Sequence, residues 1–539
     1  MFVETHTIRF LLPEIFLVGL ATWIFIGGTF AASKRLWSAY AIASYAVAGY
    51  ALFTQSSGLG GAFAAGDIIP ASGPIAVDFL AHIMRWLALI VGMLVTLMVS
   101  HGSRKAVACE VLGLIMLAVT GVMLVCSASE LVLLFLGLEL ISIPTYVLLF
   151  IGKPGRESAE ATAKYFFLSI LSSALLLYGF SFLYGMAGTT TLYGDGTVPG
   201  IRDVLLQPQE GSLAALAPLA IVLIFAGLGF KMAAVPFHFY APDVYQGTTN
   251  ANASLLAVLP KIAGAMALIR LTVITLPMFA GFAWQLALVI AVLTMTLGNV
   301  CALWQTNVRR MMAYSSIANA GYMLIGLSVA LGGASLASNE QHSGYGGVAA
   351  LALYLIVYTF GSLGTFAVLS HLSTTDREVS TLDELAGLSK SRPIAAGLIA
   401  LFMFSLAGIP PLAGFWGKLT LFTSAVGVST YAGDSPLGHW FIGLAIAGAL
   451  NAAIAAAYYL RVVATLYFKP STSPAAGEGN VGGLGAAVIC AVAVVLVGVL
   501  PGRVTTAVRV AERSALNVPR AYMGLADQTQ PSPNEVVSK

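Results

Sequence analysis

The chain has 539 residues, of which 58% are hydrophobic and only 9% are charged, and its mean hydropathy is +0.89. Because soluble globular proteins carry about 25% charged residues, this composition excludes a water-soluble domain and makes lipid the main solvent. The formal net charge of +3 is small, and no nucleic-acid partner is expected. The sequence therefore predicts an all-α polytopic membrane protein.

Fourteen apolar runs are long enough to cross a bilayer, which takes about 20 helical residues. Two of them contain helix breakers: Pro236 interrupts the seventh run, and Pro410 and Pro411 interrupt the twelfth. Each of these two spans is predicted to be a broken helix. The runs lie at about 8–28, 36–55, 75–99, 108–128, 130–152, 161–187, 213–238, 250–275, 277–303, 308–331, 346–371, 393–429, 437–468 and 480–501.

The two interrupted spans lie five spans apart, a pattern typical of transporters that are built from internal repeats with ion sites near the middle of the membrane. The expected repeats are residues 108–275 and 277–468, and a unit of five spans must be inverted relative to its copy. The connecting loops are too short for a separate catalytic domain. Residues 1–505 are therefore predicted to form one transmembrane domain, followed by a partly disordered C-terminal tail at 506–539.

Basic residues gather in alternate loops, which by the positive-inside rule face the cytoplasm. With fourteen spans, both termini then face the outer side, and the arginines of the C-terminal tail oppose this assignment only mildly. We expect a bacterial inner membrane, with an organelle membrane as the alternative. The basic loops carry Lys34, Arg35, Arg104, Lys105, Lys153, Arg156, Arg309, Arg310, Arg377, Lys390, Arg392 and Lys469.

Motifs for redox or nucleotide chemistry are missing from the sequence. The four cysteines are scattered singly through apolar runs without a CxxC pair, and the seven histidines are dispersed. Neither a phosphate-binding loop nor a dinucleotide fingerprint occurs. We therefore expect no iron–sulfur, zinc, haem or nucleotide site in this chain, and the cysteines are interpreted as packing residues.

Charged residues inside the spans are the strongest functional signal. Each costs about 2.5–3.5 kcal/mol near the centre of a bilayer, so that a deep charge needs a partner and usually has a function. Glu139 lies about 13 Å from the outer end of its helix at 1.5 Å per residue and must pair with a cation or hold a proton. Lys231, Lys261 and Lys418 are predicted proton-relay residues, because a buried lysine can hold or release a proton as its partner moves.

The remaining ionisable residues of the spans carry weaker signals. The side chain of Lys164 could extend to the membrane surface, so the residues themselves favour neither a functional nor a structural role for it. His238 follows the first break and is either a packing residue or a link in the relay. Arg85 and Arg461 near span ends are interpreted as anchors, and Asp78 as an interfacial residue.

Several segments together resemble the antiporter-like membrane subunits of respiratory complex I. PDVYQG, a lysine at 418 and the absence of a long C-terminal lateral helix resemble the N-type subunit of this family. The sequence departs from the family pattern at TTNANASLLAV (248–258) and at Phe239-Tyr240. The resembling segments are LFLGLELISIPTYVL, SAEATAKYFFLSILSSALLLYG, GFKMAAVPFHFYAPDVYQG, NVRRMMAYSSIANAGYMLIGL, LAGIPPLAGFWGKLTLF and AYYLRVVATLYF.

The resemblance implies a role for each matching residue. Glu139 and Lys231 would form a coupling ion pair, Lys261 would be the central relay lysine, and Lys418 would be the exit lysine in the broken helix. Lys164 matches a further family lysine, and this match favours a functional role for Lys164 over a structural one. The implied activity is proton translocation by a subunit without a redox centre.

The resemblance also implies partners. The complex would be an NADH:quinone oxidoreductase in which other subunits bind NADH, FMN, iron–sulfur clusters and quinone, with M-type and K-type membrane subunits as neighbours. Two alternatives stay open at this point. The chain could belong to a multisubunit sodium/proton antiporter, or it could be a structural membrane module whose charges form ion pairs for assembly.

Overall fold

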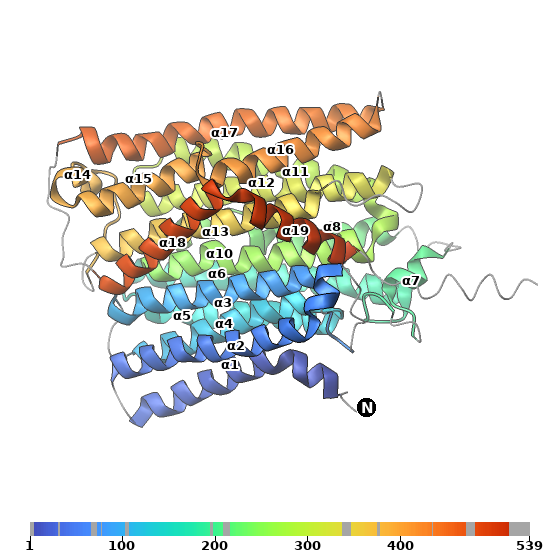
Figure 1. Ribbon diagram of the computed structural model, residues 1–539, viewed down its shortest axis with the longest axis horizontal. Coiled ribbons are helices and arrows are strands. Elements are labelled where there is room, and N and C mark those ends of the chain that lie inside the picture. The colour runs from blue at the N-terminus through green and yellow to red at the C-terminus, as the bar shows by residue number, and fades with distance from the viewer. Residues whose placement is uncertain are drawn as a thin grey trace, which may run out of the picture.

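The computed structural model describes residues 5–30, 33–65, 73–76, 78–102, 107–194, 198–207, 216–336, 346–374, 378–433, 435–470 and 480–516. These residues form one bundle of helices that lie side by side, and the chain progresses across it from α1 at one edge to α17 at the other (Figure 1). Extended pairing within the described ranges is limited to isolated bridges between loops. The predicted all-α class is confirmed.

The first half of the bundle contains α1 (Thr5–Phe30), α2 (Lys34–Ala65), α3 (Phe79–Gly102), α4 (Ala108–Ser127), α5 (Leu131–Gly152), α6 (Arg156–Ala187), α7 (Ile201–Leu206), α8 (Ala217–Met232), α9 (Ala241–Gly247) and α10 (Asn250–Leu268), which continues as a π-helix (Ile269–Thr275). The second half contains α11 (Ala280–Leu303), α12 (Val308–Leu336), α13 (Gly347–Leu372), α14 (Leu388–Ser391), α15 (Pro393–Ala407), α16 (Ala413–Ala432), α17 (Pro436–Phe468), α18 (Val481–Val499) and α19 (Pro501–Leu516).

Twelve of the described helices are long and apolar enough to cross a membrane, and up to thirteen spans result if the pair Asp383–Ser391 and Pro393–Ala407, bent by 120°, is counted as one. The predicted spans that contain breakers account for the difference from fourteen. α8 has only 16 residues, and α15 and α16 lie on opposite sides of GIPPLAG. The two broken helices are therefore confirmed, whereas the inverted five-helix repeats stay a prediction.

Both breaks begin with a residue in the left-handed conformation. α8 ends at Met232, and Ala233 follows with φ 57°. α15 ends at Ala407, and Gly408 follows with φ 89°. The prolines beyond each cap have no N–H to continue the hydrogen-bonded ladder, so the last carbonyls of each helix lie inside the bundle without a ladder partner and can accept from other donors.

The two ends of the bundle differ in charge. We call the end that holds α14 the basic end, because Lys153 and Arg309 line one cavity there and Arg310 and Lys469 form ion pairs close by. α7 and the N-terminus lie at the opposite end, which we call the far end (Figure 1). The basic loops thus gather on one side, as their alternation predicts, and the direction of the bundle in the membrane stays a prediction.

The predicted domain boundary at 505 falls inside α19, which meets α18 at an angle about halfway along the bundle (Figure 1). The N–H of Val348 donates to Glu512 Oε1 at 3.1 Å, and the N–H of Phe79 donates to Ser514 Oγ at 3.1 Å. Burial raises the pKa of Glu512 to about 7 against the opposing effects of its backbone donors and two arginines. α19 is therefore docked on α13 and α3, and the predicted disordered segment 528–539 lies outside the described residues.

Close helix packing depends on glycine at several contacts, and Gly321 of α12 gives a test. A Cβ at this position would lie 2.6 Å from the backbone N of Met295 and 2.9 Å from the carbonyl oxygen of Ala291 on α11. Gly321→Ala is therefore expected to destabilise the protein by about 1–3 kcal/mol, the usual cost of overpacking. Thermal unfolding in detergent measures it. Gly427→Ala is the matched control, because a Cβ there meets nothing within 4 Å.

Candidate functional site

Lys231 lies in the last turn of α8, just before the first break, and is only 4% exposed. Its Nζ donates to Ser142 Oγ on α5 at 2.6 Å and to Ser169 Oγ on α6 at 3.2 Å. A cation is favoured at the carboxyl end of a helix, where the last carbonyls carry partial negative charge. The lysine is thus held by two hydroxyls and by the helix terminus.

Glu139 occupies the same polar cluster without touching Lys231. The carboxylate lies on α5, one turn before Ser142, and its Oε1 accepts a hydrogen bond from Ser173 Oγ of α6 at 2.5 Å. Ser173 in turn lies one turn after Ser169, which binds the lysine. The predicted partners therefore face a shared set of serines, and the structure shows them separated by that set rather than joined as an ion pair.

Lys261 of α10 is 2% exposed, and its Nζ donates to Ser316 Oγ of α12 at 2.5 Å. The hydroxyl of Tyr358 on α13 donates to the same Ser316 oxygen at 2.8 Å. The ammonium also lies 5.7 Å from the centre of the Tyr358 ring, within the range of a cation–π contact. Tyr245 of α9 meets Ser316 at 3.2 Å, so the hydroxyl of Ser316 connects the lysine to two tyrosines.

Lys418 of α16 lies beside the second break and is 5% exposed. Its Nζ donates to the carbonyl oxygens of Leu406 and Ala407 at 2.8 and 3.0 Å, which are the last carbonyls of α15. The ring centre of Tyr322 lies 5.1 Å away. Because the break frees these carbonyls, the second broken helix supplies the ligands that hold the lysine.

A small cavity of about 10 Å³ joins the surroundings of Lys261 and Lys418. Its walls include Tyr358, Tyr354, Asn319 and Lys418, and this volume corresponds to about one water molecule. The hydroxyl of Tyr354 donates to Asn319 Oδ1 at 2.5 Å. Tyr358 therefore faces Lys418 across one water site and also binds Ser316, the partner of Lys261.

Lys231 and Lys261 approach each other through backbone packing. Gly264, one turn beyond Lys261 on α10, lies so close that an added Cβ would be 3.5 Å from Lys231 Cβ. No hydrogen bond among the described residues joins the two lysine clusters. Three buried lysines thus follow one another from α8 through α10 to α16, with a polar link in the second interval only.

Lys164 and His238 lie apart from this row. Lys164 is 40% exposed at its side chain and pairs with Asp243 at 2.6 Å and Glu160 at 2.8 Å. Asp243, within PDVYQG, also pairs with Arg310 at 2.6 Å. His238 lies in the turn between α8 and α9, and no hydrogen bond or ion pair within the described ranges joins it to a relay lysine. PDVYQG was singled out only for its family resemblance, whereas its Asp243 joins Lys164 and Arg310 in a charge cluster at the basic end.

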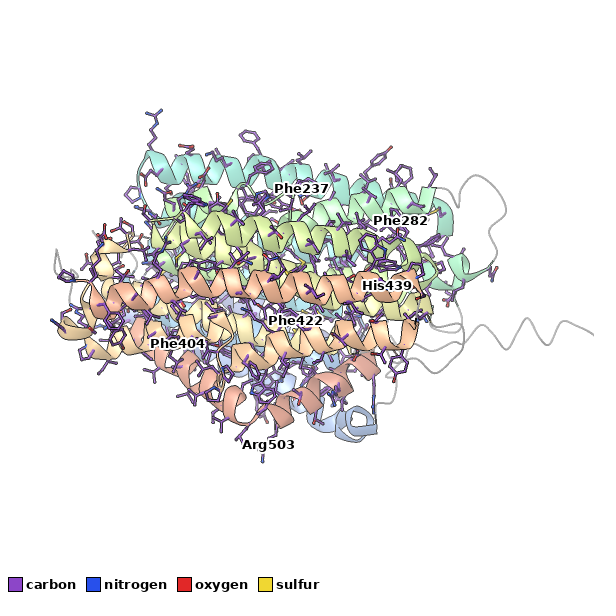
Figure 2. All side chains as sticks on the ribbon, turned by 90° about the horizontal axis from the view of Figure 1, so that it is seen from above. Phe237, Phe282, Phe404, Phe422, His439 and Arg503 are labelled. Carbon is purple, nitrogen blue, oxygen red and sulfur yellow. The ribbon has the colours of Figure 1, made fainter. Side chains whose placement is uncertain are left out.

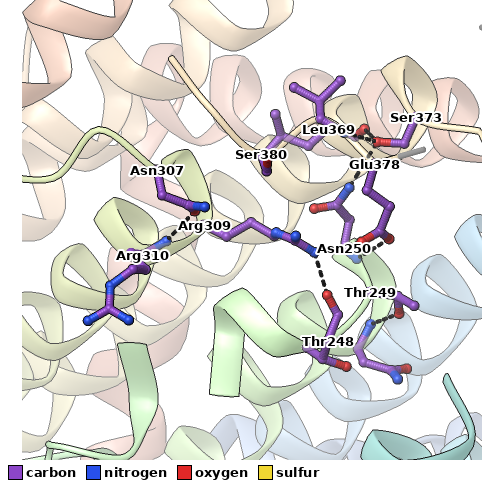
Figure 3. A network of polar contacts seen from close by, with 12 residues as sticks. Thr248, Thr249, Asn250, Asn307, Arg309, Arg310, Leu369, Ser373, Glu378 and Ser380 are labelled. Atoms are coloured by element: carbon purple, nitrogen blue, oxygen red, sulfur yellow. Dashed lines mark hydrogen bonds and ion pairs between the residues drawn. The ribbon is translucent and has the colours of Figure 1, made fainter. Parts of the chain in front are cut away.

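A polar cavity of about 530 Å³ opens at the basic end next to the start of α10. Figure 3 shows its network: Glu378 receives hydrogen bonds from Arg309 and from the N–H of Asn250, and Arg309 also donates to the carbonyl of Thr248. Asn250 Oδ1, Thr248 Oγ1 and Arg309 Nε are buried without a hydrogen-bond partner. Buried polar groups of this kind bind water, so the cavity is suited to being hydrated.

Two buried ion pairs at the far end had no counterpart in the sequence analysis. Arg270 of the π-helix, 1% exposed, pairs with Asp78 at 2.7 Å, and Arg85 of α3 pairs with Glu14 of α1 at 2.7 Å. Arg85 is thus a buried ion-pair partner and not a surface anchor, because Glu14 from another helix neutralises it. Across the described parts of the chain, no three His, Cys, Asp or Glu side chains are placed to hold a metal ion.

Comparison with known proteins identifies the family. The family described as NADH:quinone oxidoreductase/Mrp antiporter, TM, matches residues 128–436, a range that includes Glu139 and all three buried lysines. The chain is 36% identical to NADH-quinone oxidoreductase subunit N of Paramagnetospirillum magneticum over 473 residues, which are 86% of this chain and 89% of the relative. This chain belongs to the subunit N family of NADH-quinone oxidoreductases.

Other members and solved structures agree with this family. The chain is 40% identical to subunit N of Rhodospirillum rubrum over 361 residues, 67% of this chain and 68% of the relative. A chain of respiratory complex I from Thermus thermophilus with bound aureothin has a TM-score of 0.72 and 29% identity, covering 92% of this chain and 99% of that one. A chain of the Mrp complex from a Dietzia species has a TM-score of 0.75 at 19% identity, covering 96% of this chain and 99% of that one, and this likeness shows the fold alone.

Proposed function

We propose that this chain moves protons across a membrane as a subunit, without a redox centre of its own, of an NADH-quinone oxidoreductase. One observation carries the proposal. Lys231, Lys261 and Lys418 are buried, and each is held by hydroxyl or carbonyl oxygens without a carboxylate in contact among the described residues. A buried charge without a counter-ion is costly, and groups in that situation inside membranes serve proton relays.

Protons would enter from the basic end. The cavity there adjoins Asn250, and Ser254 and Lys261 follow on α10 at spacings of four and seven residues, which lie on one helix face. From Lys261 the path would continue through Ser316 and Tyr358 to the single-water cavity and Lys418. Hydroxyl groups both donate and accept, so each can pass a proton without a permanent charge.

Glu139 would control the charge on Lys231. The carboxylate binds Ser173 while the lysine binds Ser142 and Ser169. A shift of Glu139 towards the lysine would stabilise the ammonium, and the separated arrangement would favour transfer of its proton along the row. Movement of charge in a neighbouring subunit could drive this exchange electrostatically.

The remaining parts of the proposal concern the complex as a whole. NADH oxidation and quinone reduction would occur in partner subunits with FMN and iron–sulfur clusters, and M-type and K-type membrane subunits would be neighbours. We propose a bacterial inner membrane with the basic end in the cytoplasm and both termini outside. The relatives named subunit N at 36% and 40% identity favour this assignment over an Mrp-type antiporter, for which the structural likeness concerns the fold alone.

Glu139→Gln and Lys231→Ala are each expected to lower proton pumping about tenfold in the assembled complex. A positioned acid or base usually contributes a factor of about 10²–10⁴ to a rate. We expect a smaller loss here because water can replace part of the path. The measurement is the proton-to-electron ratio in membrane vesicles driven by NADH. Glu110→Gln and Lys390→Ala are matched controls, because both side chains are exposed and away from the row. Unchanged pumping in both site variants, with the complex assembled, would refute the proposal.

A further inference from the structure

The short helix α9 is the second half of the first broken span. α8 ends inside the length of the bundle, and Phe237, in the turn that follows it, lies well away from either end (Figure 2). α9 covers the remaining distance to the basic end with only seven residues, and so short a helix depends on tertiary contacts for its stability. Its direction must therefore be fixed by its neighbours.

Asp243 of α9 forms ion pairs with two other helices at once. Its Oδ2 accepts from Lys164 Nζ of α6 at 2.6 Å, and its Oδ1 accepts from Arg310 Nη1 of α12 at 2.6 Å. Gln246, about one turn later on α9, also accepts from Arg310, at 3.0 Å. Each oxygen of one carboxylate thus binds a different helix. We call Lys164, Asp243 and Arg310 the α9 clamp.

The two arms of the clamp belong to the helices that hold the first two relay lysines. Lys164 lies five residues before Ser169 on α6, whose hydroxyl binds Lys231. Arg310 lies six residues before Ser316 on α12, whose hydroxyl binds the second relay lysine. At 1.5 Å per residue, these separations are about 8 and 9 Å along the helices. The clamp therefore connects a wall of the first site to a wall of the second.

α9 also reaches the second site directly. Tyr245, two residues after Asp243, places its hydroxyl 3.2 Å from Ser316 Oγ. This tyrosine is 3% exposed, and its ring centre lies 6.0 Å from that of Phe366 on α13. Because Ser316 Oγ is the atom that accepts from Lys261, a shift of α9 would change the surroundings of the second lysine through this tyrosine.

Close packing limits how α9 can shift. At its basic end α9 is pressed against α6, since a Cβ on Gly247 would lie 2.7 Å from Ala161 Cβ and 2.7 Å from the carbonyl oxygen of Glu157. At its other end α9 continues from the turn at the break, which is not part of a helix. A displaced α9 would thus pivot about its basic end, and the clamp is placed to fix the angle of that pivot.

We infer that Asp243 is a positioning residue that couples the first two lysine sites, by holding α9 between α6 and α12. No hydrogen bond among the described residues joins the clusters of Lys231 and Lys261, and the clamp supplies a connection across this interval. The inference rests on the proposed proton relay. It assigns Lys164 to the clamp and not to the row of residues that carry protons.

The first test breaks each arm of the clamp separately. Lys164→Met leaves Asp243 paired with Arg310, and Arg310→Met leaves it paired with Lys164, so neither variant leaves the carboxylate without a cation. Each is expected to lower proton pumping in the complete complex about fivefold, the lower end of typical couplings between sites. Asp383→Asn breaks another exposed ion pair at the basic end. It is the matched control and should pump normally.

The double variant Lys164→Met/Arg310→Met separates coupling from stability. A bridge needs both arms, so the double variant should pump no worse than either single variant. Ion pairs that only stabilise the fold act independently, and pumping would then fall about 25-fold, the product of two separate losses. The thermal midpoint, in contrast, should fall further with each lost pair. A multiplied loss of pumping, or normal pumping in both single variants, overturns the inference.

A second cycle does not need that double variant to assemble. Tyr245→Phe removes the hydroxyl at Ser316 and keeps the ring, and it should also lower pumping about fivefold. Because the clamp acts through Tyr245, Lys164→Met/Tyr245→Phe should lose no more than either change alone, and a multiplied loss contradicts the coupling. Lys261→Met is measured beside these variants. If it pumps normally, the proposed function fails, whereas a loss confined to Lys261→Met refutes the clamp alone.

Discussion

Lys261→Met is expected to leave the complex assembled while proton pumping falls about 10²-fold, the lower range for loss of a positioned proton-transfer group. Methionine has a similar length and fills the same space, and replacing a buried charge by an apolar side chain of similar volume is often neutral or stabilising. The hydroxyl of Ser316 keeps its contacts with Tyr358 and Tyr245 after the substitution, so no buried polar group loses its only partner. The variant therefore separates function from folding.

The measurement is the proton-to-electron ratio of vesicles, together with the thermal midpoint of the purified complex. Lys390→Met serves as the control, since that lysine is exposed at the basic end. Ser316→Ala should reproduce most of the loss while Lys261 stays in place, because it removes the oxygen between the lysine and Tyr358. Pumping that survives both variants would show that the row of lysines does not carry the protons.

The sequence was sufficient to find the charged residues of the site. Lys231, Lys261 and Lys418 stand out because a charge within an apolar run is rare in proteins of any kind. The two breaks could be predicted as well, although proline alone is a weak guide: Pro144 and Pro260 lie inside α5 and α10 without ending them. The interrupted helices differ in that a left-handed residue precedes the proline.

The uncharged side chains that bind the lysines could not be predicted from the sequence in the same way. The lysines are bound or surrounded by Ser142, Ser169, Ser316 and Tyr358. Serine and tyrosine are common in membrane helices, so their presence in a sequence does not indicate a functional site. A spacing argument was available at one place only, because Ser142 lies one turn after Glu139 on α5 and so shares its face. The contact between α10, α12 and α13 arises from the tertiary fold.

Separation along the chain explains the other omissions. α19 docks on α13 and α3, although its residues from 506 onwards were predicted to be a tail, because charged residues interrupt the apolar residues of this 16-residue helix. Ion pairs between distant segments were equally hidden. Arg270 lies near the end of the predicted span 250–275, and nothing local connects it to Asp78, which lies 192 residues earlier.

The ion pair between Asp78 and Arg270 predicts a large loss of stability when Asp78 is neutralised. Asp78 Oδ2 accepts from Arg270 Nη2 at 2.7 Å, while its Oδ1 accepts from the N–H of Ala81 and so caps α3. Asn is as good a cap as Asp, so Asp78→Asn removes the charge and retains the cap. Arg270 is 1% exposed, and it also donates to the Cys126 carbonyl and to Tyr193. These neutral acceptors cannot balance its charge.

Asp78→Asn is therefore expected to lower the free energy of unfolding by about 3–5 kcal/mol, the cost of leaving a buried charge unpaired, measured by denaturant titration of the purified protein in detergent. Asp383→Asn breaks the exposed pair with Lys469 and should cost at most about 1 kcal/mol. Asp78→Asn combined with Arg270→Met should lose less than Asp78→Asn alone, because the unpaired cation is then gone. A loss for Asp78→Asn no larger than for Asp383→Asn would mean that water reaches Arg270, and the far end of the first half would then be open to solvent instead of closed by this pair.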